Sequence, residues 1–250
     1  MSGTETETGK RRVALVTGGA KRVGRAIVTR LAERGCDVAF TYLSGESEAR
    51  ELQNTLRHSG CKAFAVRADL TDPLSAVAMI GELIESEFGR LDVLVNNASL
   101  YEPDRLGDVA LEQSRRHWAI HFESPLLLCQ RFSPLLRQAG GHVVNMLDLL
   151  AERPRPEYLT YCASKAGLWN LTLSLARELA PQVTVNGIAP GAVAWPENFP
   201  DADRQKYLGR VPLGRAGTPE DVARLVYFLC TGGGYLTGQI IRLDGGRSIT

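Results

Sequence analysis

A regular alternation of short apolar runs with longer helix-like segments constrains the fold more than any other feature. Seven runs rich in Val, Ile and Leu begin at residues 13, 37, 63, 91, 141, 182 and 239. The segments between them, such as RAIVTRLAERG and AVAMIGELIESEFG, carry apolar residues at helical spacing. Apolar strands that alternate with helices are typical of a parallel sheet covered on both faces. We therefore expect an α/β fold with one doubly wound, Rossmann-like domain and a seven-stranded parallel sheet.

The chain has the length and composition of a single domain. Its 250 residues are 44% hydrophobic, which is enough for one sizeable core, and no Ser/Gly-rich or Pro-rich linker divides them. Gly35, Gly89 and Pro181 stand where predicted helices end. We predict a disordered polar tail over residues 1–11, one domain over residues 12–250, and a substrate loop at about 192–212.

Charge and cysteine content argue against several classes of protein. The 29 Lys and Arg residues nearly balance the 28 Asp and Glu residues, so no nucleic-acid partner is expected. No apolar run approaches the roughly 20 residues of a membrane span, and the N-terminus lacks a secretory signal. The five scattered cysteines have no C-x-x-C spacing, and His117 and His121 have no obvious third ligand. We therefore predict a cytoplasmic protein with no metal site and a small-molecule substrate.

The first predicted strand leads directly into a glycine-containing turn, TGGAKRVGRAIV. Gly18 and Gly19 lie in the turn and Gly24 lies at the start of a helix. Such a turn directs backbone N–H groups and the positive end of the helix dipole toward an anion, such as a dinucleotide pyrophosphate. The spacing differs from G-x-G-x-x-G, so a purely structural turn is the alternative. Lys21 and Arg22 favour the phosphate interpretation.

The end of the second strand, FTYLSG, indicates which nucleotide is bound. An acidic residue there would pair with the ribose hydroxyls of NAD and repel a 2′-phosphate. No acid is present, Ser44 can donate a hydrogen bond, and Arg22 supplies a positive charge. These features favour NADPH. The alternative is a solvated Arg22 and an enzyme that uses either nucleotide.

Tyr161 and Lys165 are four residues apart in YLTYCASKAGLWNL, on one face of a predicted helix. An ammonium group near a phenol stabilises the phenolate, so we expect Lys165 to lower the Tyr161 pKa toward neutrality. That shift would make Tyr161 an acid and base at physiological pH. The alternative is an ordinary amphipathic helix on which the two residues lie at the solvent boundary.

In combination, these motifs resemble the short-chain dehydrogenase/reductase family over residues 12 to 250. TGGAKRVG resembles its nucleotide turn, Asp69 its adenine-contacting acid, and NNAS at Asn96 to Ser99 its strand-four motif. Tyr161 and Lys165 match the catalytic pair, and IAPGAV matches the segment beside the nicotinamide. The resemblance implies a homotetramer and the cofactor-binding residues Gly18, Arg22, Val23, Ser44, Asp69, Leu70, Asn97, Ala98, Tyr161, Lys165, Pro190, Gly191 and Val193.

Two departures from the family pattern narrow the expected substrate. Asp148 stands where most members have Ser, and Arg22 stands where most have Gly. Together they resemble the pteridine reductase branch, which includes dihydromonapterin and dihydrofolate reductases. A carboxylate would repel the oxyanion of a carbonyl substrate, whereas it can accept hydrogen bonds from the aminopyrimidine edge of a pterin. The resemblance implies hydride transfer to a C=N bond, with Asp148, Tyr161 and Lys165 as catalytic residues.

The same resemblance implies a set of substrate contacts. They are Arg22, Ser99, Tyr101, Asp148, Tyr158 and Trp195, with Ser99 and Arg22 also near the cofactor phosphates. Simpler alternatives are that Tyr101 is a loop aromatic, that Trp195 packs under the substrate loop, and that Asp148 caps the next segment. His121 aligns with a family Asn. Two rival functions stay open: an alcohol or ketone reductase, and a non-catalytic NADP(H)-binding sensor.

Overall fold

The seven apolar runs form seven parallel strands of one sheet, in the order β3-β2-β1-β4-β5-β6-β7. A computed structural model describes residues 11–195 and 200–250. The strands are β1 (Arg12–Val16), β2 (Cys36–Tyr42), β3 (Ala63–Arg67), β4 (Val93–Asn96), β5 (His142–Met146), β6 (Thr184–Pro190) and β7 (Ile240–Leu243). This confirms the predicted doubly wound, parallel α/β fold.

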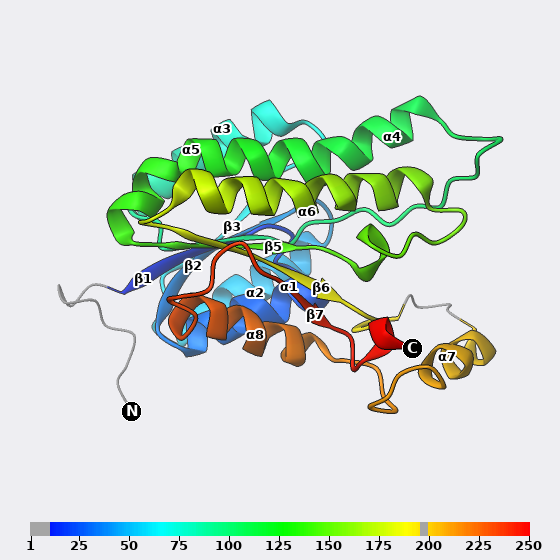
Figure 1. The fold of residues 1–250 in the computed structure, drawn as a ribbon. Coiled ribbons are helices and arrows are strands. Elements are labelled where there is room, and N and C mark those ends of the chain that lie inside the picture. The colour runs from blue at the N-terminus through cyan, green and yellow to red at the C-terminus, as the bar shows by residue number, and fades with distance from the viewer. Residues whose placement is uncertain (1–10, 196–199) are drawn as a thin grey trace.

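Two helical layers cover the sheet (Figure 1), with α1, α2 and α8 on one face and α3, α4, α5 and α6 on the other. Each layer buries its own apolar cluster against the sheet, as expected from strands that are apolar on both faces. The helices are α1 (Arg22–Glu33), α2 (Glu46–His58), α3 (Pro73–Glu87), α4 (Leu111–Trp118), α5 (Ser124–Ala139), α6 (Leu159–Leu179), α7 (Asp201–Leu208) and α8 (Pro219–Thr231). Three short turns of helix are η1 (Ala119–Glu123), η2 (Leu149–Ala151) and η3 (Arg247–Ile249).

The strand order positions the site. The chain builds the sheet outward from β1 to β3, then returns to place β4 on the other side of β1. Connections on the two sides of this switch point diverge, which leaves a crevice at the carboxyl ends of β1 and β4. The glycine turn after β1 and the NNAS segment after β4 both open into that crevice.

The structure also bears on the predicted domain limits. Residues 1–10 of the predicted tail lie outside the described residues. The guanidinium of Arg11 donates to the carbonyl oxygens of Gly35, Cys36 and Gly60. The predicted substrate loop contains α7, and its residues 196–199 lie outside the described part.

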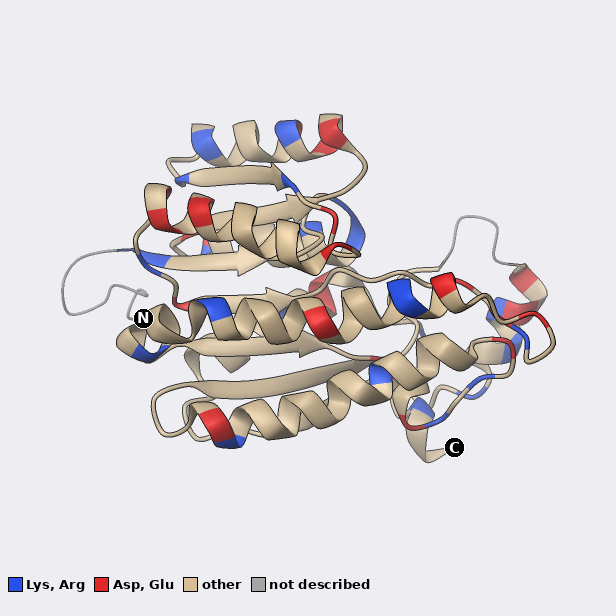
Figure 2. Ribbon diagram, turned by 90° about the horizontal axis from the view of Figure 1, so that it is seen from above, with Lys and Arg blue, Asp and Glu red and all other residues tan. Residues whose placement is uncertain are grey.

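Charged residues of both signs are spread over the molecule (Figure 2). None of the described helices is long and apolar enough to cross a bilayer.

Candidate active site

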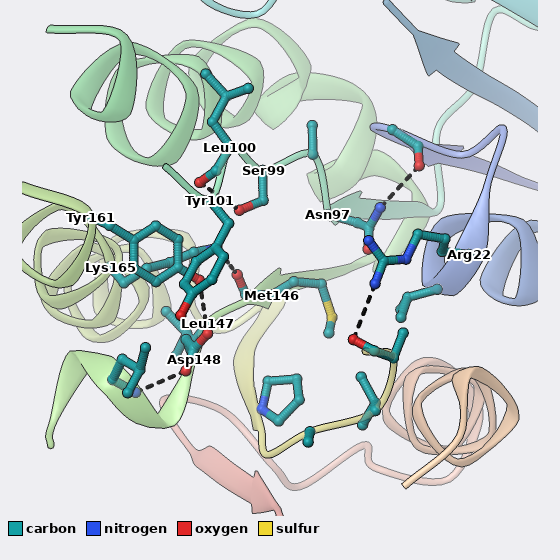
Figure 3. A pocket seen from close by; sticks show the side chains of 18 of the residues that line it. Arg22, Asn97, Ser99, Leu100, Tyr101, Met146, Leu147, Asp148, Tyr161 and Lys165 are labelled. Atoms are coloured by element: carbon teal, nitrogen blue, oxygen red, sulfur yellow. Dashed lines mark hydrogen bonds between the residues drawn. The ribbon is translucent and has the colours of Figure 1, made fainter. Parts of the chain in front are cut away.

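A cavity of about 1260 Å³ opens at the carboxyl ends of the strands. Typical small-ligand pockets measure about 300–1,000 Å³, so this one has room for a large cofactor and a substrate together. Its lining includes every site residue predicted from the sequence except Tyr158. Side chains that are distant in sequence therefore meet in one place (Figure 3).

The turn after β1 packs tightly against the segment after β4. Gly18 adopts a φ of 63°, and its N–H donates to Thr41 Oγ1 at 3.0 Å. The amide of Asn97 donates to the carbonyl oxygens of Thr17 at 2.8 Å and Gly18 at 3.1 Å. A Cβ atom on Gly24 would lie 2.0 Å from the Gly18 carbonyl oxygen, so no side chain fits there. The start of α1 thus faces the cavity, as a pyrophosphate site requires.

The two cations of the turn point in different directions. Lys21 Nζ lies 2.7 Å from Glu48 Oε1 and beside the backbone of Gly45, at the turn that follows β2. Arg22 instead donates to the carbonyl oxygens of Ala194 at 3.0 Å and Trp195 at 3.1 Å (Figure 3). The prediction that Arg22 supplies positive charge beside Ser44 is therefore corrected: Lys21 occupies that place, because the Arg22 side chain extends across the cavity to the substrate loop.

The backbone of Arg22 adopts a conformation that favours glycine. Its φ is 50°, in the left-handed region that costs a non-glycine residue roughly 1–2 kcal/mol. The two hydrogen bonds to the substrate loop offset this cost. Arg22 thus connects the nucleotide turn to the loop that carries Trp195.

We expect Lys21→Ala to lower the preference for NADPH over NADH by about 10–100-fold in kcat/KM, the range for a lost charge-assisted hydrogen bond. The loss should fall on NADPH, because only NADPH carries a 2′-phosphate. Arg25→Ala is the matched control. Arg25 on α1 pairs with Glu51 on α2 at 2.9 Å, as Lys21 pairs with Glu48 on α2, but Arg25 does not line the cavity. Equal preference in Lys21→Ala and the wild type would contradict this role of Lys21.

Asp148 and Tyr161 form a direct pair at the carboxyl end of β5. The Tyr161 hydroxyl donates to Asp148 Oδ2 at 2.7 Å, and the Leu150 N–H donates to Oδ1 at 2.8 Å (Figure 3). Asp148 therefore caps η2 with one oxygen, the simpler alternative, and holds the phenol with the other. Both roles coexist because a carboxylate offers two acceptor oxygens.

The pKa of Tyr161 shifts in the direction opposite to the prediction. Burial raises it well above its ordinary value of 10.0, and the Asp148 carboxylate raises it further. Lys165 Nζ donates to the Met146 carbonyl oxygen at 2.8 Å and lies 5.9 Å from the centre of the Tyr161 ring. Burial and an adjacent anion oppose ionisation of the phenol more strongly than this ammonium favours it. Tyr161 is therefore protonated at neutral pH.

The other two ionisable groups of the set are also shifted by burial. Burial raises the pKa of Asp148 above its ordinary value of 3.8, although hydrogen bonds from Leu150 and Tyr161 oppose the shift. Burial lowers the pKa of Lys165 to about 8. An acid with a raised pKa next to a proton donor is the arrangement expected of a proton-transfer site.

Aromatic rings form one wall of the cavity. Tyr101 is 42% exposed, stacks on Tyr158 at 4.4 Å between ring centres, and meets Tyr161 edge-on at 4.9 Å. Tyr158 does not line the cavity, because the Tyr101 ring covers it. The expectation that Tyr158 lines the pocket is corrected: it supports Tyr101 from behind. Trp195 lines the cavity and packs edge-on against Tyr207 at 5.3 Å, so both interpretations of Trp195 apply.

His121 connects two serines behind Tyr161. Its Nδ1 lies 2.8 Å from Ser164 Oγ, and its Nε2 lies 2.8 Å from Ser99 Oγ. Ser164 Oγ also lies 2.7 Å from the Tyr161 carbonyl oxygen, and two oxygens this close require a hydrogen between them. Ser164 therefore donates to that carbonyl and accepts from His121 Nδ1–H, which leaves Nε2 to accept from Ser99. The hydroxyl proton of Ser99 is thus engaged by His121, and the predicted contact of Ser99 with the pterin and the cofactor phosphates stays a prediction.

Several lining residues escaped the sequence analysis. They include Arg153 and Arg155 after β5, Lys206 and Arg210 near α7, and Arg247 near the C-terminal end. Lys206 and Arg210 fall within the predicted substrate loop, but no charge in that loop was singled out, and the excess of positive charge is the signal that could have drawn attention to all five. Among the described residues, no group of three or more His, Cys, Asp or Glu side chains is placed to hold a metal ion.

Comparison with known proteins places the chain in a family. A family profile described as Enoyl-(Acyl carrier protein) reductase matches residues 18–248. The 3-oxoacyl-(acyl-carrier-protein) reductase FabG of Staphylococcus aureus is 35% identical over 242 residues, covering 93% of this chain and 96% of that protein. The chain belongs to the short-chain dehydrogenase/reductase family.

Two solved structures with bound nucleotides are also similar. One is the FolM alternative dihydrofolate reductase 1 of Brucella canis in complex with NADP. It is 34% identical, with a TM-score of 0.87 over 96% of this chain and 95% of that one. The other is a blue fluorescent protein from a metagenomic library in complex with NADPH. It is 36% identical, with a TM-score of 0.89 over 95% of this chain and 98% of that one. The nucleotide-dependent oxidoreductase class predicted from the sequence is thus confirmed.

Proposed function

We propose that this chain is an NADPH-dependent pterin reductase that transfers hydride to a C=N bond of a dihydropterin or dihydrofolate. The observation that carries the proposal is the Tyr161 hydroxyl donating to the Asp148 carboxylate at 2.7 Å. A carboxylate beside the proton donor is unfavourable for a substrate that develops an oxyanion, but it suits one that presents N–H groups and a basic ring nitrogen. The similarity to FolM supports the same substrate class.

The cavity fits a dinucleotide cofactor. Because Gly18 and Gly24 carry no side chains, the backbone at the start of α1 is accessible to a phosphate group. Lys21 lies beside the turn after β2. Asp69, which follows β3, and Val193, which follows β6, line the cavity on opposite sides of this turn. NADPH supplies the hydride when bound. The chain's own residues then orient the substrate and deliver the proton.

Proton delivery depends on the ionisation state of the Asp148–Tyr161 pair. If Asp148 is ionised, a proton lost by Tyr161 leaves two anions in direct contact, which explains the raised pKa of the phenol. If Asp148 carries a proton, Tyr161 can protonate the substrate nitrogen and immediately regain a proton from Asp148. The end state is the bonded pair seen in the structure. The raised pKa of Asp148 increases the population of this donor state.

The second candidate is a carbonyl reductase, which the similarity to FabG favours. The two functions predict different substrates for the same cavity. We would supply the purified protein with NADPH and dihydrobiopterin, dihydromonapterin, dihydrofolate, simple ketones and a 3-oxoacyl thioester, and follow the consumption of NADPH. We expect turnover of the pterins. Turnover of ketones or thioesters alone would contradict the proposal, and tight NADPH binding without turnover would favour a sensor.

We also propose the homotetramer that the family resemblance implies. Sedimentation equilibrium of the full chain tests this assembly, and a monomer at all concentrations would contradict it.

A further inference from the structure

Besides Lys21, Arg22 and Lys165, five cationic side chains line the cavity. They are Arg153, Arg155, Lys206, Arg210 and Arg247, and we refer to them as the basic rim. They come from three separate parts of the chain: the segment after β5, α7 with its C-terminal end, and η3. Only the tertiary structure brings them together.

Two contacts connect the basic rim to the substrate side of the cavity. The Arg155 guanidinium lies 5.2 Å from the centre of the Tyr158 ring, on which Tyr101 stacks. The Arg247 guanidinium lies 5.6 Å from the centre of the Tyr207 ring, against which Trp195 packs. Each of these two arginines therefore contacts a ring that packs against an aromatic residue predicted to contact the substrate, Tyr101 in one case and Trp195 in the other.

The positive charge of the rim is not neutralised by ion pairs among residues 11–195 and 200–250. Arg153 and Arg247 each donate a long hydrogen bond of 3.5 Å to the Thr250 main-chain oxygen, and Arg247 also donates to Thr250 Oγ1 at 3.5 Å. Arg247 Nε is buried without a partner. Asp203 is the one carboxylate on α7 that lines the cavity. Like charges gathered at a cavity wall raise the local potential and favour an anionic ligand.

We propose that the basic rim binds an anionic group on the side chain of the pterin substrate. This inference rests on the proposed function, because it assumes that the pterin ring lies between Tyr101 and Asp148. The side chain then extends toward α7 and η3. A guanidinium matches the geometry of a carboxylate or phosphate through two parallel hydrogen bonds, so four arginines and a lysine that line one cavity suit either group. The favoured substrate class is a dihydropterin with an anionic tail, such as dihydrofolate.

The experiment compares substrates with the same ring and different tails. We would measure kcat and KM for dihydrofolate, dihydroneopterin triphosphate and the uncharged dihydrobiopterin, in wild type, Lys206→Glu and Arg210→Glu. We expect each substitution to raise KM for the two anionic substrates about tenfold and to leave dihydrobiopterin unchanged. Added salt should likewise raise KM for the anionic substrates only. A larger effect on dihydrofolate assigns the rim to carboxylates, and a larger effect on the triphosphate assigns it to phosphates.

Arg204→Glu is the matched control for charge on α7. Arg204 lies on the same helix, pairs with Asp201 at 3.4 Å and does not line the cavity. If KM for dihydrofolate rises equally in Arg204→Glu, the effect is general electrostatics and the rim is not a site. Equal kcat/KM for charged and uncharged pterins in the wild type, independent of salt, would also overturn the inference while leaving the proposed function intact.

Binding measurements separate failure of this inference from failure of the proposed function. If no pterin is turned over, the proposed function fails. Calorimetric titration of the NADP-bound protein with dihydrofolate and dihydrobiopterin then still tests the rim. Tighter binding of dihydrofolate that is lost in Arg210→Glu would support an anion site, and equal affinities would overturn it.

Discussion

Tyr161→Phe is expected to lower kcat for pterin reduction by about 10²–10⁴-fold, the usual contribution of a positioned proton donor. The substitution removes only the hydroxyl, which in the described structure bonds to Asp148. The phenyl ring keeps its edge-on contacts with Tyr101 and His121. We therefore expect NADPH affinity, measured by fluorescence titration, to stay unchanged.

Tyr227→Phe is the control for this substitution. Tyr227 lies on α8, with the Arg34 guanidinium 5.4 Å from its ring centre, and it does not line the cavity. It should have wild-type kcat. Retained activity in Tyr161→Phe would mean that the proton comes from another group.

Asp148→Asn should produce the second large effect, because an amide cannot pass a proton to Tyr161. In the wild type, kcat should fall as pH rises through the raised pKa of Asp148, since ionisation removes the donor state. The Asn variant should lose about 10²–10⁴-fold in kcat at the low-pH plateau and lose this pH dependence. A full pH–rate profile of both proteins provides the measurement.

Thermal unfolding gives an independent readout for the same pair. The folded-state pKa of Asp148 lies above its unfolded value, so protonation stabilises the fold, and this contribution is lost as pH rises through the raised pKa. At neutral pH the buried carboxylate therefore reduces stability. We expect Asp148→Asn to unfold at the same or a higher temperature than wild type at pH 7. Its unfolding temperature should not gain the contribution that protonation of Asp148 gives the wild type at low pH. A large loss of Tm would mean that Asp148 has mainly a structural role as the cap of η2.

Replacing Asp148 by serine, the residue that the family resemblance leads us to expect at this position, tests the substrate assignment directly. Asp148→Ser removes the anion beside Tyr161 and restores a neutral hydrogen-bond donor. We expect pterin reduction to fall and ketone reduction to rise, because a neutral donor stabilises a developing oxyanion. Unchanged substrate preference would show that Asp148 does not select the substrate.

Local patterns in the sequence predicted the fold and the membership of the site. The strands of a doubly wound sheet are buried on both faces, so apolar composition alone marks them. Functional side chains follow the carboxyl ends of those strands, so the motifs also predicted which residues meet. All predicted site residues except Tyr158 line one cavity.

Directions of side chains and shifts of pKa could not be predicted in this way. Arg22 and Lys21 are adjacent in sequence, yet one reaches Trp195 and the other Glu48. The spacing of Tyr161 and Lys165 suggested a lowered phenol pKa, whereas burial and Asp148 raise it. Both outcomes depend on which groups of other segments surround the side chain and how much water they exclude.

The sequence by itself therefore determined the α/β architecture, the nucleotide turn and the Asp148, Tyr161 and Lys165 set. These depend on periodicity and on motifs contained within short segments. Only the tertiary structure decided that Asp148 holds the Tyr161 proton, that His121 orients Ser99, and that five cations converge at the cavity rim. Electrostatic interactions act over a few ångströms in space, and residues as far apart as Arg153 and Arg247 become neighbours only when the chain folds.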